Sequence, residues 1–403
     1  MKKIALILAI FAVFAFGAGS GAASATQNKT KSQNKTQKHY ILKLALAWEN
    51  TLPLLGQTAL EFKNYAEIMS GGRLKIQIHT PSQHKSNLQI LDFVKDGKYE
   101  LGYTSLYYYQ NKDTKMALYT AVPFGMTSDE QHAWFYYGGG KELGEKLFSK
   151  YGIKVFLMGS TGMQMGGWFK KEINSLDDLH GLKIRIPGFG AEVMNRLGVT
   201  INTLPMHELY KAFKMGTIDA VEWINPIYDT MLNFHTVANY YYTGWQEPTA
   251  DTHLLVNKKA FESLPKDLQM ILELAARVAG ENFQNKSFYQ NAKMLEKLKK
   301  EYPSVQIRHF PDDVVAALKN ATEEILEEEC AKDPLFKEIL QSQMEFQKTA
   351  REWKMANEVA FLNSQSKKQD ENLTIIDDTN SSKNSPNLLN LDKNLTDKND
   401  TKN

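Results

Sequence analysis

Strand-like and helix-like segments alternate early in the chain. Three short apolar runs, at residues 41–47, 74–78 and 99–103, have the length or the alternation of β-strands. Between them, residues 55–69 and 88–94 repeat apolar side chains with helical spacing. Because strand, helix, strand, helix, strand is typical of a parallel sheet covered by helices, the sequence predicts an α/β fold.

A short pattern near the end of this region occurs again further along the chain. A lysine, a glycine two residues later and an acid three residues after that occupy residues 95–100 and again 214–219. In both places the glycine ends a predicted helix and a short apolar strand begins. Chance can also produce so short a repeat. The repeated pattern nevertheless favours two similar α/β lobes over one large sheet.

The last part of the folded region is predicted to be helical. Helical spacing extends over residues 264–300 and 312–362, with a break near Asp333 and Pro334. We assign residues 336–362 to a long C-terminal helix, which must pack on a lobe, the hinge or a second chain. From residue 363 to the end, Asn, Asp, Lys and Ser dominate, which predicts a disordered tail.

The first 25 residues have the features of a cleaved secretory signal. Lys2 and Lys3 form a charged start, residues 4–16 are apolar, and small residues at 23–25 suit a cleavage site. A membrane anchor is less favoured, because spanning a bilayer takes about 20 residues. We therefore expect export to the periplasm, with residues 26–38 as a polar linker.

The charges of the chain are nearly balanced, with 48 basic and 46 acidic residues. The expected signal removes two lysines and no acid, so the mature chain has no net field to attract nucleic acid. A charged ligand must then be recognised locally. Cys330 is the single cysteine, which excludes an intramolecular disulfide, and we expect its thiol to be buried.

Two motifs that suggest chemistry have simpler explanations. Three glycines at 138–140 precede Lys141, but a phosphate-binding loop needs Ser or Thr after the lysine, and Glu142 follows here. A break between two helices is the better interpretation. The acidic run at 323–329 is interpreted as a solvated helix face. The sequence contains no HExxH, no paired CxxC and no Gly-x-Ser-x-Gly motif.

A few polar residues in apolar surroundings are candidates for ligand binding. Arg185 ends a predicted strand before a Pro-Gly turn, where its fork of donors matches a carboxylate, although a structural ion pair is equally compatible. Glu222 lies beside Trp223, and Glu247 lies close to Trp245. Each acid, taken alone, is best explained as structural, and a cation site requires that they converge.

Several long motifs together carry a family resemblance. They are TAVPFGMTSDEQ (120–131), WFYYGGG (134–140), GMQMGGW (162–168), GTIDAVEW (216–223) and YYYTGW (240–245). The chain from about residue 40 to about residue 362 resembles the extracytoplasmic solute-binding subunits of tripartite ATP-independent periplasmic (TRAP) transporters. It is most similar to the subgroup that binds 2-oxo and 2-hydroxy monocarboxylates.

The resemblance implies a two-lobed, periplasmic-binding-protein-like fold with central sheets flanked by helices. One lobe would comprise residues 39–161 and about 249–290, and the other about 162–248 and 291–335. The lobes would be joined by crossing segments and would close on the ligand.

The resemblance also implies the site. Arg185 would hold the substrate carboxylate, with Gln164, Tyr107, Tyr108 and Trp223 as further substrate-binding residues. A sodium or calcium ion would be bound with the substrate, and hard cations of this kind take oxygen ligands. The implied ligands are the side chains of Gln164, Glu222 and Glu247 and the backbone carbonyl of Trp223.

The function implied by the resemblance is a receptor that performs no covalent chemistry. It would bind a small organic carboxylate and deliver it to the membrane subunits of the transporter, and a homodimer through the C-terminal helix is possible. A ligand-binding partner of a chemoreceptor or sensor is one alternative. An enzyme acting on small organic acids is a second, against which the sequence shows no assembled nucleophile, base and orienting group.

The tail carries a feature that the family does not explain. Its four Asn-x-Ser/Thr sequons each have an aspartate two residues before the asparagine; the asparagines are Asn372, Asn380, Asn394 and Asn399. The other four sequons, at Asn28, Asn34, Asn285 and Asn320, have no acid at that position. An Asn- and Asp-rich composition produces some matches by chance, but the pattern favours sites of bacterial N-glycosylation.

Overall fold

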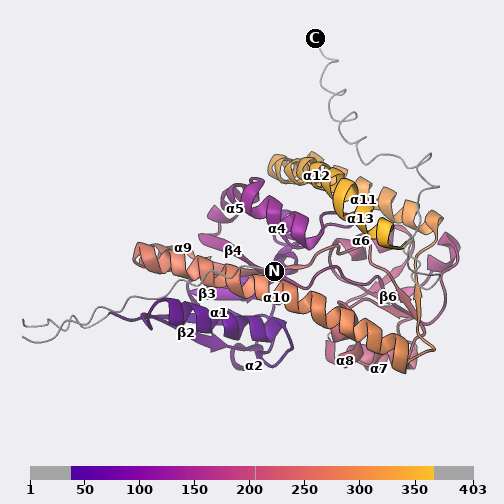
Figure 1. Ribbon diagram of the computed structural model, residues 1–403, viewed down its shortest axis with the longest axis horizontal. Coiled ribbons are helices and arrows are strands. Elements are labelled where there is room, and N and C mark those ends of the chain that lie inside the picture. Colours follow the sequence, from indigo (N-terminus) through magenta and orange to yellow (C-terminus); the bar gives the residue numbers. More distant parts are fainter. Residues whose placement is uncertain (1–37, 205, 367–403) are drawn as a thin grey trace, which may run out of the picture. The chain divides into compact units, whose positions relative to one another are not determined.

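A computed structural model describes residues 38–204 and 206–366, and the elements below all lie in the compact unit His39–Asn403. These residues form two β-sheets flanked by helices, which confirms the predicted α/β class (Figure 1). No helix in the described part is long and apolar enough to cross a membrane. The predicted signal peptide, most of the linker and the sequons of the tail lie outside the described residues.

The first sheet has five strands in the order β2-β1-β3-β10-β4. Their bounds are β1 Tyr40–Leu46, β2 Leu74–His79, β3 Leu101–Thr104, β4 Ile153–Ser160 and β10 Asp251–Asn257. The first three strands pair in parallel, as predicted. The sheet as a whole is mixed, because β10 returns from the second sheet and runs antiparallel to both of its neighbours.

The second sheet has six short strands in the order β11-β9-β5-β8-β6-β7. Their bounds are β5 Gly167–Phe169, β6 Lys183–Arg185, β7 Thr200–Asn202, β8 Ala220–Val221, β9 Tyr240–Tyr242 and β11 Gln306–Arg308. It too is mixed, since β5 runs antiparallel to β8 and β9 while β6, β7 and β8 are parallel. The prediction of two α/β units rather than one large sheet agrees with this division.

The helices predicted at 55–69, 88–94, 264–300 and 312–362 all form within a few residues of those bounds, and further helices lie between them. The α-helices are α1 Leu55–Met69, α2 Pro81–His84, α3 Ile90–Lys95, α4 Ser128–Tyr137, α5 Gly140–Ser149, α6 Gly188–Arg196, α7 Met206–Met215, α8 Pro226–Met231, α9 Lys258–Glu262, α10 Lys266–Glu301, α11 Asp312–Lys332, α12 Pro334–Lys354 and α13 Ala360–Ser366. The triple glycine separates α4 from α5, as predicted, and Gly139 adopts a φ of 89° that an L-residue rarely adopts.

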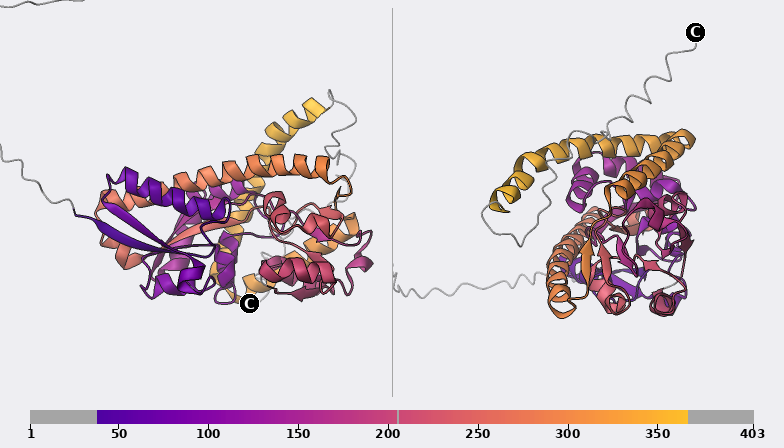
Figure 2. Two further views of the ribbon diagram at one scale, coloured as in Figure 1. Left: turned by 90° about the horizontal axis from the view of Figure 1, so that it is seen from below. Right: turned by 90° about the vertical axis from the view of Figure 1, so that its right-hand side faces the viewer.

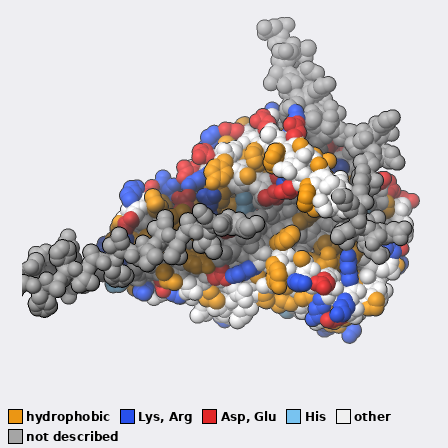
Figure 3. All heavy atoms as spheres, in the orientation of Figure 1, with side chains coloured by type: hydrophobic (Ala, Val, Ile, Leu, Met, Phe, Trp, Pro, Cys, Tyr) orange, Lys and Arg blue, Asp and Glu red, His pale blue; other side chains and the backbone are white. Residues whose placement is uncertain are grey.

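One helix contributes to the cores of both sheets. Leu272, Ala275 and Ala279 of α10 pack with the apolar face of the first sheet, and Leu298 of the same helix packs with the second. α10 therefore runs alongside both sheets (Figure 2). Around it, acidic and basic side chains are interspersed on the face that Figure 3 shows, in keeping with the balanced composition.

The helical break at Asp333 and Pro334 is confirmed. The Asp333 carboxylate caps α12 by accepting from the backbone N–H groups of Leu335 and Phe336, and Pro334 takes the first helical position. Cys330, near the end of α11 just before the break, is half-buried rather than buried as predicted.

The acidic run on α11 forms one face of an amphipathic helix. Ile325 and Leu326 are buried, whereas Glu324 and Glu328 are exposed and pair with Arg196. The helical region continues through α12, the π-helical turn Met355–Val359 and α13, so the long C-terminal helix is present.

Candidate functional site

The core of the candidate site lies where two parallel strands end. Arg185 is the last residue of β6, and Glu222 follows directly after β8, its hydrogen-bonded neighbour. The Glu222 N–H donates to the Arg185 carbonyl at 2.8 Å, so the pairing continues one residue past β8. Parallel strands present their carboxyl ends at one edge of a sheet, which is where ligands bind in α/β folds.

The Arg185 guanidinium is held by backbone and by an aromatic ring. Its Nη1 donates to the Glu222 carbonyl at 2.8 Å, and its centre lies 4.8 Å from the centre of the Trp223 ring. The carboxylate of Glu222 is 3.9 Å away, beyond hydrogen-bond distance. No other hydrogen bond joins the guanidinium to a described residue, and its other N–H groups therefore stay available as donors.

Gln164 and Glu247 are brought together by the segments that connect the two sheets. The Gln164 N–H donates to the Glu247 carbonyl at 3.0 Å, and the Gln164 side-chain amide donates to the Thr161 hydroxyl at 3.3 Å. Gly244 makes this approach possible. A Cβ atom there would lie 1.9 Å from the Gln164 carbonyl oxygen, so the two segments could not approach as closely with any other residue.

The side-chain oxygens of this group are buried and have no hydrogen-bond donor among the described residues. They are Gln164 Oε1, both carboxylate oxygens of Glu222, and Glu247 Oε2. Their residues are at most 5% exposed. Buried polar atoms without partners are costly, so four of them in one place indicate a bound partner that accepts oxygen ligands. A cation is such a partner, and these residues fit it.

The donor set is mixed rather than rich in acids. Among the described residues, no group of three His, Cys, Asp or Glu side chains is placed to hold a metal ion. Two glutamates, one amide oxygen and a backbone carbonyl instead suit a hard ion such as sodium or calcium, not a transition metal.

The raised pKa values of the two glutamates also indicate a bound cation. Burial raises the pKa of Glu222 well above its usual range, the charge of Glu247 raises it further, and Arg185 opposes the shift. Burial raises the pKa of Glu247 to about 8, opposed by Arg185 and Gln164. Both carboxylates are therefore costly to ionise here unless a positive charge is added beside them.

Two adjacent tyrosines belong to the same neighbourhood. Tyr107 and Tyr108 lie on a 3-10 helix, Leu106–Tyr109, with their ring centres 4.7 Å apart. Burial raises the pKa of both phenols, and the charge of Glu247 raises both pKa values further. The charge of Arg185 lowers the pKa of Tyr108. The structure thus brings together all seven residues that the sequence singled out for the site.

Sequence reasoning missed Asp229, a buried residue on α8. Burial raises its pKa to about 7, opposed by hydrogen bonds from Tyr241, Ile224 and Trp168. The charge of Asp229 in turn raises the pKa of Glu222. A single aspartate in a short helix has no periodicity or motif to mark it, and only the proximity of distant strands reveals it.

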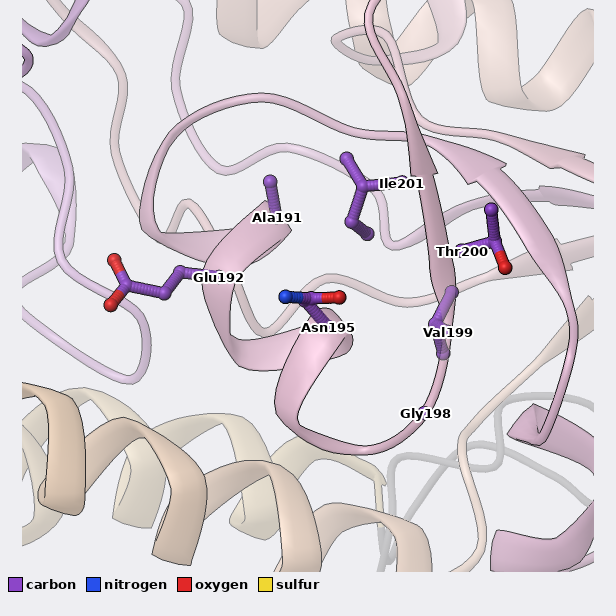
Figure 4. Close-up of a pocket in the computed structure, with 7 residues that line it drawn as sticks. All are labelled: Ala191, Glu192, Asn195, Gly198, Val199, Thr200 and Ile201. Carbon is purple, nitrogen blue, oxygen red and sulfur yellow. The ribbon is translucent and has the colours of Figure 1, made fainter.

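A separate hollow of about 600 Å³ lies between α6 and β7. Figure 4 shows its lining, which is Ala191, Glu192, Asn195, Gly198, Val199, Thr200 and Ile201. None of the candidate site residues contributes to it, and it has no basic side chain for an anion. The candidate site is therefore the buried group around Arg185, not this hollow.

Comparison with known proteins agrees with the geometry. Residues 46–333 match the family described as bacterial extracellular solute-binding protein, family 7. A monocarboxylate 2-oxoacid-binding periplasmic protein of Nostoc sp. (strain PCC 7120) is 38% identical over 328 residues, which cover 81% of this chain and 89% of the relative.

Solved structures of similar chains contain ligands. A TRAP periplasmic solute-binding protein from Colwellia psychrerythraea, with bound calcium and pyruvate, is 47% identical and has a TM-score of 0.79. Another from Pseudoalteromonas atlantica, with bound sodium and pyruvate, is 46% identical and has a TM-score of 0.78. Each match covers 81% of this chain and at least 99% of the relative.

A third structure, from Bordetella bronchiseptica, is a dimer with calcium and picolinate in one active site. It is 32% identical with a TM-score of 0.77, over 81% of this chain and 97% of that one.

Proposed function

Because the chain belongs to the bacterial extracellular solute-binding proteins of family 7, we propose that it is a periplasmic receptor for a small 2-oxo or 2-hydroxy monocarboxylate. It delivers this ligand to the membrane subunits of a TRAP-type transporter. The observation that carries the proposal is a cluster of buried oxygens with no hydrogen-bond donor among the described residues, beside a guanidinium that makes one hydrogen bond to them. The ligands of the Colwellia and Pseudoalteromonas relatives support it.

Each component of the site has a proposed role. Arg185 binds the ligand carboxylate through its unused N–H groups. The side-chain oxygens of Gln164, Glu222 and Glu247, with the Trp223 carbonyl, hold a sodium or calcium ion. Such an ion stabilises the ionised form of the two glutamates and supplies a positive centre for the paired oxygens of a 2-oxo acid.

The aromatic residues shape the rest of the pocket. Tyr107 and Tyr108 lie on the first-sheet side, and Trp223 lies against the guanidinium on the other. Rigid rings on both sides exclude water from the ligand and strengthen the charge interactions. The role is capture and release without covalent change, and recovery of the ligand unchanged after prolonged incubation supports a receptor over an enzyme acting on small acids.

The C-terminal helix has a proposed role in dimerisation. Trp353, Met355, Phe361 and Leu362 are all more than half exposed on this helix. Large apolar side chains along one helical region favour a protein partner. We propose a second copy of this chain as that partner, which is consistent with the dimer of the Bordetella relative.

Native mass spectrometry of the protein purified from the periplasm tests these proposals together. The expected species is a chain that begins at Thr26, carries one small carboxylate and one cation, and includes dimers. A protein that shows neither ligand nor cation, even after incubation with pyruvate and calcium, would contradict the receptor assignment. A ligand-binding partner of a chemoreceptor or sensor is the alternative if ligand binds but purified TRAP membrane subunits are not engaged.

A further inference from the structure

Asp229 is a buried carboxylate beside the proposed site. It is 1% exposed and accepts three hydrogen bonds. The Trp168 indole and the Tyr241 hydroxyl donate to its Oδ2 at 3.1 and 2.7 Å, and the Ile224 backbone N–H donates to its Oδ1 at 3.1 Å. An ionised carboxylate, which only accepts hydrogen bonds, satisfies all three donors at once.

The hydrogen bond from Ile224 sets the direction of a proposed cation ligand. The Ile224 N–H and the Trp223 carbonyl belong to one peptide group, which is planar and almost always trans, so the two point in opposite directions. By holding the N–H, Asp229 turns the Trp223 oxygen away from itself. The Met165 N–H donates to the Ile224 carbonyl at 3.1 Å and fixes the other side of the same turn.

Asp229 also adds a third buried carboxylate, and its three hydrogen-bond donors favour the ionised form. It interacts with Glu222, and the charge of Arg185 acts on Glu222, Glu247 and Asp229 alike. When a bound cation draws all three carboxylates into their ionised form, one guanidinium leaves an excess of negative charge in a poorly solvated region. A divalent ion offsets such an excess more completely than a monovalent ion of similar size.

We propose that Asp229 is a positioning residue that orients the Trp223 carbonyl and makes the cation site prefer calcium over sodium. This inference rests on the proposed cation site and adds to it a residue outside the implied ligand set. It also names the ion that the receptor selects.

Asp229→Asn tests the proposal, because the amide keeps the size of the side chain and an acceptor for Ile224 but loses the charge. Calcium and, separately, sodium are titrated into the protein with saturating pyruvate, in buffer free of both ions, and followed by tryptophan fluorescence. We expect the calcium Kd to rise by about tenfold and the sodium Kd by about threefold, because the lost charge interacts twice as strongly with a divalent ion.

Asp251→Asn is the matched control. Asp251 is also 1% exposed and accepts from the Thr249 hydroxyl, but its charge is not among those that shift Glu222 or Glu247. Its loss is expected to leave the calcium-to-sodium ratio unchanged. If the amide variant does not fold, Asp229→Ser removes the same charge with a smaller side chain and has the same expected result.

An equal change for both ions, or no change, in a folded Asp229 variant would overturn the proposal while leaving the cation site intact. Failure of the unaltered protein to bind either ion would instead contradict the proposed function, and the role of Asp229 with it.

Discussion

Replacing Arg185 with alanine removes the group proposed to bind the ligand carboxylate. The Arg185 side chain is 15% exposed and makes a single hydrogen bond to the described residues, so most of its donors remain available to a ligand. Removing one member of a buried, hydrogen-bonded charge pair costs about 2–5 kcal/mol, which corresponds to roughly 30-fold to several thousand-fold in Kd. We expect Arg185→Ala to weaken pyruvate binding within this range.

Thermal unfolding measures this effect. In the unaltered protein, a ligand at about 100 times its Kd adds roughly 2.7 kcal/mol to the free energy of unfolding. For Arg185→Ala, weakened by 30-fold or more, the same pyruvate concentration should add at most about 0.9 kcal/mol, about a third of the effect in the unaltered protein. Arg185→Lys keeps the charge but loses the planar fork and should give an intermediate shift. A shift in the alanine variant equal to that of the unaltered protein would refute the role of Arg185.

Three further predictions concern the acids, a buried histidine and the tail. Glu222→Gln and Glu247→Gln should each weaken cation and pyruvate binding together in calorimetric titration. The expected loss is at least roughly tenfold, which is the effect of removing a hydrogen-bond partner of a metal ligand. The control Glu208→Gln, at an exposed position, should leave both affinities unchanged. Burial lowers the pKa of His253 to about 3, so the unfolded state binds more protons below its ordinary pKa of 6.5. The free energy of unfolding should therefore fall on acidification below about pH 6.5, by up to about 1.4 kcal/mol per pH unit, and His253→Gln should flatten this slope in denaturant titrations. Glycans on Asn372, Asn380, Asn394 and Asn399 should raise the intact mass of protein from a host with a bacterial oligosaccharyltransferase, whereas the bare mass from such a host would contradict glycosylation.

Much of the fold could be predicted from local sequence. Helical spacing located α1 and α10 within a few residues, and the triple glycine and Pro334 marked breaks that the structure confirms. The antiparallel insertion of β10 could not be predicted, because its apolar sequence is the same whichever way the strand runs. The direction of a strand depends on which other strands lie beside it in the folded protein.

The site was predictable only in part, and for a related reason. Arg185 and Glu222 stand out as polar residues at the ends of apolar runs, but nothing local shows that their strands are neighbours. Only the family motifs indicated that these residues come together. Asp229 carries no such mark, since its hydrogen-bond donors Trp168 and Tyr241 lie on two other strands that meet α8 only in the folded protein.

Titration of pyruvate into protein stripped of metal tests the central claim, that a cation and Arg185 together bind the carboxylate. The protein is treated with a chelator, sodium is replaced by a bulky organic cation, and heat is measured before and after calcium is restored. We expect no measurable binding without a small cation and full recovery with calcium, because the cation supplies the positive centre that holds the paired oxygens of the ligand. Undiminished pyruvate affinity in the stripped protein would show that the buried acids are structural and that no cation takes part.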